Sequence, residues 1–124
     1  MKILVVDDHH DSVDSLSRLL EAHGHETGQA YDGRQALEVF RQFEPDAVVL
    51  DLDMPILDGY ATCRAIRMAP RERLPVLVAL TALSGHDPRR LAFEAGFDAH
   101  VTKPARIDAL IALIEKLHDE RGKH

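Results

Sequence analysis

Residues 3–8 read Ile3-Leu4-Val5-Val6-Asp7-Asp8, a short run rich in β-branched residues that stops at two carboxylates. The run does not alternate with polar residues, which is typical of a strand covered by helices on both faces. Apolar residues then recur at helical spacing as far as Gly24, and a glycine commonly lies just past the end of a helix. This opening predicts one strand–helix unit of a parallel sheet.

The same unit recurs four more times along the chain. Strong apolar runs predict strands at residues 47–50 and 76–80, and weaker patterns predict strands at 26–30 and 99–101. Helical spacing predicts the remaining helices, at residues 34–43, 60–68, 88–95 (with Asp87 as the N-cap) and 106–118. Parallel strands need crossover connections of this kind, so the pattern predicts a three-layer α/β sandwich.

Composition limits the possible functions. The 124 residues are 45% hydrophobic, enough for one core, so we expect a single domain over residues 1–120 and a frayed polar tail over 121–124. Acidic residues outnumber basic ones by 21 to 15, a net charge of −6, which argues against nucleic acid or an anionic membrane as a direct partner. A single cysteine excludes an internal disulfide. Without a signal-peptide pattern or a long apolar run, we expect a cytoplasmic protein.

The ends of the predicted strands carry the candidate functional side chains, namely Asp7, Asp8, Asp51, Thr81 and Lys103. Ligands of open parallel sheets bind beyond the carboxyl ends of the strands. Three carboxylates gathered there repel one another, and a hard divalent cation such as Mg²⁺ removes that cost. An ammonium and a hydroxyl suit the oxygens of a phosphoryl group, and a carboxylate can attack phosphorus to form an aspartyl phosphate.

These residues resemble the receiver domain of two-component response regulators, and the resemblance covers essentially the whole chain. Four segments carry it, each at the end of its own predicted strand: Asp7-Asp8, residues 51–55 with Asp58-Gly59, Leu80-Thr81-Ala82, and residues 100–104. The resemblance implies a flavodoxin-like (βα)5 fold whose five-stranded sheet has the order 2-1-3-4-5. Residues 7–11 and 96–100 are also similar to receivers attached to hybrid histidine kinases.

The resemblance also implies a role for each site residue. Asp51 would be the phosphoacceptor and, with Asp7, Asp8 and the backbone carbonyl of Asp53, a Mg²⁺ ligand. The Thr81 hydroxyl, the Ala82 amide and the Lys103 ammonium would contact the phosphoryl oxygens. Thr81 and His100 would be the switch residues, and the Lys103–Pro104 bond would be cis.

The function that follows from the resemblance is signalling. A histidine kinase or histidine phosphotransfer protein would donate the phosphoryl group to Asp51. The switch would change the face made by the fourth helix, the fifth strand and the fifth helix, where a downstream protein or a second copy would bind. Beyond its own phosphorylation and slow dephosphorylation, we expect no enzymatic activity.

Two residues depart from the family pattern, and two other functions stay open. Asp53 adds a carboxylate at the mouth of the site, and His100 replaces a commoner Tyr or Phe and can titrate near neutral pH. Asp51-Leu52-Asp53 also matches the start of haloacid-dehalogenase-like phosphatases, although the acidic pair would then come too early in the chain. A receiver-like scaffold that is never phosphorylated is the third possibility.

Several other features have a simpler interpretation. The eight histidines are expected to be surface residues, and Cys63, in the middle of a helix, to be an inert thiol. The last helix has an apolar stripe that should be core, and Leu113, Ala109 and Ala112 extend it toward solvent, either as good helix formers or as part of a partner patch.

Overall fold

Five parallel strands form one sheet in the order β2-β1-β3-β4-β5 in the computed structural model, which describes residues 1–52, 59–69, 74–82 and 86–121. The strands are β1 (Lys2–Val6), β2 (Glu26–Ala30), β3 (Ala47–Asp51), β4 (Val76–Thr81) and β5 (Ala99–Thr102). The helices are α1 (His10–Ala22), α2 (Gly33–Phe43), α3 (Gly59–Arg67), α4 (His86–Ala95) and α5 (Ile107–Arg121). The predicted flavodoxin-like architecture is confirmed.

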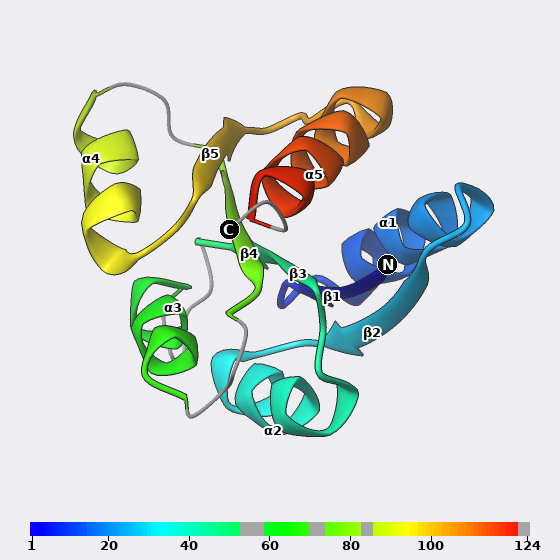
Figure 1. The fold of residues 1–124 in the computed structure, drawn as a ribbon, viewed down its shortest axis with the longest axis horizontal. Coiled ribbons are helices and arrows are strands. Elements are labelled where there is room, and N and C mark those ends of the chain that lie inside the picture. The colour runs from blue at the N-terminus through cyan, green and yellow to red at the C-terminus, as the bar shows by residue number, and fades with distance from the viewer. Residues whose placement is uncertain (53–58, 70–73, 83–85, 122–124) are drawn as a thin grey trace.

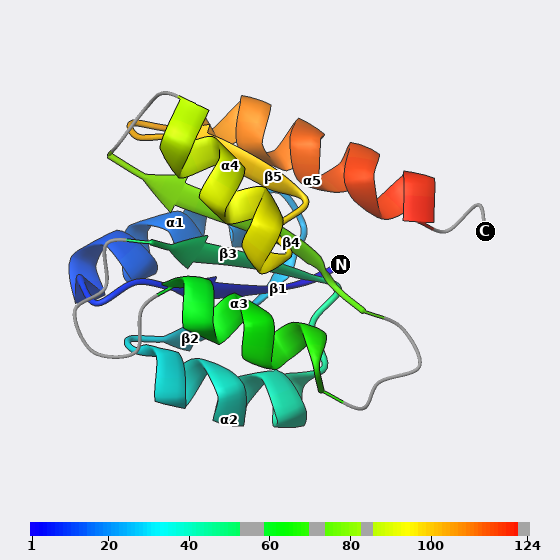
Figure 2. The ribbon, with the colours of Figure 1, turned by 90° about the vertical axis from the view of Figure 1, so that its left-hand side faces the viewer.

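Helices cover both faces of the sheet (Figure 1), with α1 and α5 on one face and α2, α3 and α4 on the other. Neighbouring residues of β1 therefore point into different cores: Ile3 packs on the α1–α5 side and Leu4 on the α2–α4 side. Both are fully buried, as the continuous apolar run of β1 predicted. Figure 2 shows the parallel strands behind α3 and α4, which face the viewer.

Helix boundaries follow local chemistry. Asp32 precedes α2, and its side chain accepts a hydrogen bond from the Gln35 amide, as expected of an N-cap. The prediction that Asp87 is the N-cap of α4 is wrong, because the helix begins at His86 and Asp87 lies in its first turn. Pro88 is compatible with this longer helix because the first-turn amides have no intrahelical acceptor. The last helix, α5, continues to Arg121, beyond the predicted end at residue 118.

No helix in the described part of the chain is long and apolar enough to span a membrane.

Cys63, the single cysteine, lies where α3 packs against α4. Cys63 is fully buried, and its Sγ donates a hydrogen bond to the Ala95 carbonyl oxygen. Burial raises the pKa of this thiol to about 11, so almost no thiolate is present at pH 8. We expect iodoacetamide at pH 8 to label the folded protein only through rare opening, and the urea-unfolded protein rapidly. Mass spectrometry of timed samples measures this, and fast labelling of the folded chain would contradict the packing.

Candidate functional site

The strand order brings three polar strand ends to one edge of the sheet. Because β1, β3 and β4 are adjacent, Asp7 after β1, Asp51 at the end of β3 and Thr81 at the end of β4 lie side by side. Lys103 follows β5, and its backbone amide donates to the Thr81 carbonyl oxygen at 2.8 Å, which continues the β4–β5 pairing by one residue. The sequence-predicted side chains of Asp7, Asp8, Asp51, Thr81 and Lys103 thus all lie at the carboxyl edge of the sheet.

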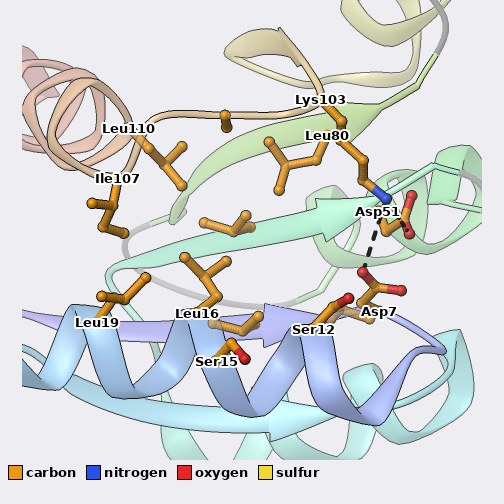
Figure 3. A pocket seen from close by; sticks show the side chains of 14 residues that line it. Asp7, Ser12, Ser15, Leu16, Leu19, Asp51, Leu80, Lys103, Ile107 and Leu110 are labelled. Atoms are coloured by element: carbon orange, nitrogen blue, oxygen red, sulfur yellow. Dashed lines mark hydrogen bonds and ion pairs between the residues drawn. The ribbon is translucent and has the colours of Figure 1, made fainter.

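Asp51 lies at the centre of the site. Only 1% of its surface is exposed, and Lys103 Nζ donates a hydrogen bond to its Oδ2 at 2.9 Å. The same ammonium lies 3.9 Å from Asp7 Oδ2, so one cation faces two buried carboxylates. Figure 3 shows the Lys103 side chain reaching over Asp51, with Asp7 just past the end of the neighbouring strand β1. The Lys103 ammonium can stabilise negative charge that develops beside the Asp51 carboxylate during a reaction.

The pKa of Asp7 is raised by its burial close to a second carboxylate. Burial is the main cause that raises the pKa of its carboxyl above 3.8, and the neighbouring Asp51 raises it further. The backbone amide of His9 works in the opposite direction, because it donates to Asp7 Oδ1 at 3.0 Å and favours the charged form. The folded protein therefore holds two acids in a place where both are ionised only at a cost.

The acidic cluster has the donor set of a cation site. One side-chain ligand atom from each of Asp7, Asp8, His9 and Asp51 lies within 4.8 Å of the other three. Two ligands of one Mg²⁺ ion lie at most about 4.2 Å apart, since each metal–oxygen bond is about 2.1 Å long, so small movements would suffice. Asp8 Oδ1 is buried, yet it accepts no hydrogen bond from the residues that the structure describes. A buried carboxylate oxygen whose hydrogen bonds are not satisfied by these residues fits a cation that it would bind.

A cavity lies beside the buried Asp51 carboxylate. It has a volume of about 330 Å³ and lies between α1, α5 and the sheet, and Asp7, Asp51 and Lys103 form its polar end. Its remaining wall is largely apolar, with Leu16 from α1 and Leu110 from α5 among the side chains visible in Figure 3. Asp51, although almost fully buried, therefore borders open space.

Of the remaining predicted site residues, the structure describes some but not all. Thr81 is buried, Ala82 is exposed directly after it, and the Lys103–Pro104 peptide bond is cis. The backbone carbonyl of Asp53, predicted as a metal ligand, lies outside the described residues, as do residues 54–58.

His100 lies on β5, where it pairs in register with Ala79 of β4. Its ring is partly covered, and the Nε2 atom is buried with no hydrogen-bond partner among the described residues. Burial lowers the pKa of His100 below 6.5, and the positive charge of Arg89 on α4 lowers it further. The neutral fraction of His100 at pH 7 is therefore larger than that of an exposed histidine. An uncharged ring is closer to the Tyr or Phe that is commoner at this position.

Sequence reasoning missed His9, which was grouped with the surface histidines. Its Nδ1 lies 3.2 Å from Asp7 Oδ1 and equally close to Asp8 Oδ1. The hydrogen bond to Asp7 is the main cause that raises the pKa of His9 above 6.5, and Asp8 adds to it. The signal that could have found it is its position directly after the acidic pair, where the chain turns into α1.

Comparison with known proteins identifies related sequences over nearly the whole chain. The family described as response regulator receiver domain matches residues 3–115. Transcriptional regulatory protein PrrA of Mycobacterium tuberculosis is 40% identical over 121 residues, 98% of this chain and 51% of that protein. Response regulator MprA of Mycolicibacterium vanbaalenii is 41% identical over 117 residues, 94% of this chain and 50% of that protein. The chain thus spans about half the length of these curated relatives.

Solved structures give the same result. Chemotaxis protein CheY4 of Vibrio cholerae superposes with a TM-score of 0.87 at 25% identity, over 93% of this chain and 96% of that one. The receiver domain of a signal transduction histidine kinase from Syntrophus aciditrophicus superposes with a TM-score of 0.85 at 31% identity, over 96% of this chain and 90% of that one.

Proposed function

Because this chain belongs to the response regulator receiver family, we propose that its Asp51 accepts a phosphoryl group in a Mg²⁺-dependent reaction and thereby switches a signalling surface. The observation that carries the proposal is the buried Asp51 carboxylate, held 2.9 Å from Lys103 Nζ and beside the second carboxylate, Asp7. Asp51 is the nucleophile in this proposal because, of the two carboxylates that face the ammonium, it is the one hydrogen-bonded to Lys103 Nζ, and it borders the cavity from the central strand.

The transfer is a displacement at phosphorus. An Asp51 oxygen forms a bond to the phosphorus atom as the bond between phosphorus and the donor's nitrogen or acyl oxygen breaks, and the leaving group takes that electron pair. Lys103 pairs with the phosphoryl oxygens as charge develops on them, and the Thr81 hydroxyl and the Ala82 amide donate to the same oxygens. Asp7, Asp8, Asp51 and the Asp53 carbonyl would hold Mg²⁺, which supplies further charge neutralisation.

The output is a shift between two conformations of the α4–β5–α5 face. Thr81 moves toward the phosphoryl group, and the neutral ring of His100 follows inward; phosphorylation biases an equilibrium that exists without it. Two large apolar side chains of α4, Leu91 and Phe93, are exposed, and Ala109 and Ala112 of α5 are also exposed. A downstream protein or a second copy of the chain would bind there.

The donor would be a histidine kinase or a histidine phosphotransfer protein, as the family implies. Any catalysis belongs to the domain's own phosphorylation and slow dephosphorylation, since Asp51 is itself the acceptor.

Incubation with acetyl phosphate tests the proposal. We expect intact-mass spectrometry to show a single phosphoryl adduct that needs Mg²⁺, disappears with EDTA, and maps by fragmentation to Asp51. The adduct should survive acid and be lost in base, as an acyl phosphate is. An absence of adduct together with an absence of Mg²⁺ binding would favour a scaffold, and steady multiple turnover of a small phosphoester would favour the phosphatase alternative.

A further inference from the structure

The side chain of His9 is directed toward the acidic pair Asp7-Asp8 and does not cap α1. His9 is the N-cap residue of α1, yet its side chain makes no capping hydrogen bond. Its Nδ1 instead points back to the two carboxylates that precede it, 3.2 Å from one oxygen of each. The ring is 71% exposed, so packing does not hold it there. The acidic pair is the reason for its orientation.

The two oxygens of Asp7 face opposite partners. Oδ2 lies on the side of Lys103, at 3.9 Å, whereas Oδ1 accepts from the His9 amide and lies beside the His9 ring. Asp8 Oδ1, the buried oxygen without a hydrogen bond, is on this same histidine side. The imidazole nitrogen of His9 therefore lies beside two carboxylate oxygens, one from each member of the acidic pair.

The two distances from His9 Nδ1 to these oxygens suit shared coordination of one metal ion. Neighbouring ligands of an octahedral ion with bonds of about 2.1 Å lie about 3.0 Å apart. The two nitrogen–oxygen distances of 3.2 Å are close to that edge length. An imidazole nitrogen suits ions such as Mn²⁺, Co²⁺ and Zn²⁺ better than Mg²⁺, which prefers oxygen.

We propose that His9 is a nitrogen ligand of the metal site and that the site therefore binds Mn²⁺, Co²⁺ and Zn²⁺ more tightly than its carboxylates alone would. The inference rests on the proposed function, because it names a further ligand of the same cation. It gives the domain a response to the available transition metal as well as to Mg²⁺. Phosphorylation of Asp51 would then depend on which ion occupies the site.

The chain contains a matched control in the next residue. His10 is also an exposed histidine at the start of α1, but its ring stacks on Tyr31 with ring centres 3.8 Å apart. It does not belong to the cluster of potential ligands. Replacing His9 or His10 with Asn removes one imidazole in each case, and only the first removal should change the metal site.

Electron paramagnetic resonance of bound Mn²⁺, on tag-free protein, tests the proposal. We expect electron spin echo modulation to detect a directly bound ¹⁴N nucleus in the wild type and in His10→Asn, and none in His9→Asn. His9→Asn should also weaken Co²⁺ and Zn²⁺ binding at least about 10-fold, the lower limit seen even for outer partners of metal ligands, with a smaller change for Mg²⁺.

Two failures have different meanings. Mn²⁺ that binds to the wild type without nitrogen modulation would overturn the role of His9 and leave the phosphoacceptor proposal intact. If neither Mn²⁺ nor Mg²⁺ binds to the wild type, the metal site of the proposed function is itself wrong. Asp8→Asn, which should weaken both ions, shows that the signal arises from this cluster.

Discussion

Asp51→Asn is expected to abolish the phosphoryl adduct formed with acetyl phosphate and Mg²⁺, while the fold is retained. The amide lacks the charged oxygen that attacks phosphorus, and no other carboxylate in the described part of the chain is both buried and hydrogen-bonded to Lys103 Nζ. Intact-mass spectrometry of the variant and the wild type under the same conditions measures the loss. Asp108→Asn is a control, because it removes an exposed acid from α5 and should leave the adduct unchanged.

The stability of Asp51→Asn has a predictable sign. The raised pKa of Asp7 means that the folded state holds this proton more firmly than the unfolded state, so its stabilising effect exists at low pH and is lost as pH rises through the raised value. At pH 7 an ionised Asp7 beside Asp51 is a net cost, which the amide reduces. We expect Asp51→Asn to be at least as stable as the wild type without Mg²⁺, and to gain less stability when Mg²⁺ is added. Thermal unfolding with and without Mg²⁺ checks both statements.

Much of the fold was predictable because its strands are buried on both faces. The runs around Val5, Val49 and Val78 are continuous and apolar, and each becomes a strand of the central sheet. Strand order is different, since pairing between distant segments leaves no periodicity in the sequence. The order 2-1-3-4-5 came from the family resemblance, and the structure confirms it.

The site was predictable to the extent that parallel topology determines it. Asp7, Asp51 and Thr81 each end a strand, so the topology alone brings them to one edge of the sheet. Side-chain direction is not determined in this way. His9 and His10 are adjacent and chemically identical, yet one ring faces the acidic pair and the other stacks on Tyr31.

Long-range side-chain contacts were also beyond the sequence. Arg67, at the end of α3, donates to the Gly96 carbonyl oxygen at 2.7 Å and forms an ion pair with Asp98 at 2.8 Å. The same Asp98 carboxylate accepts from the Leu77 amide, which links α3 to the start of β4. These partners are 21 to 31 positions apart in the sequence, and no local pattern marks them as partners.

Lys103→Met should have the largest combined effect, on stability and on phosphorylation. The two partners of the Lys103–Asp51 pair differ in exposure: the lysine side chain is 33% exposed and the aspartate 1%. Water can solvate Lys103 when Asp51 is removed, but it reaches Asp51 poorly when Lys103 is removed. Removing one partner of a fully buried pair costs about 3–5 kcal/mol, and we expect about 2–3 kcal/mol here because the lysine is partly solvated. Phosphorylation should slow by about 100-fold or more, the cost of losing a group that stabilises developing charge.

A double variant separates a charge effect from a packing effect. If the uncompensated Asp51 carboxylate causes the instability of Lys103→Met, then adding Asp51→Asn should restore most of the lost stability, and the two changes should be strongly non-additive in urea unfolding. Lys103→Arg retains the positive charge but presents it differently, so it should preserve stability better than Met while still slowing phosphorylation. Equal stability of Lys103→Met and the wild type, or additive effects in the double variant, would mean that the 2.9 Å ion pair does not determine the energetics of this site.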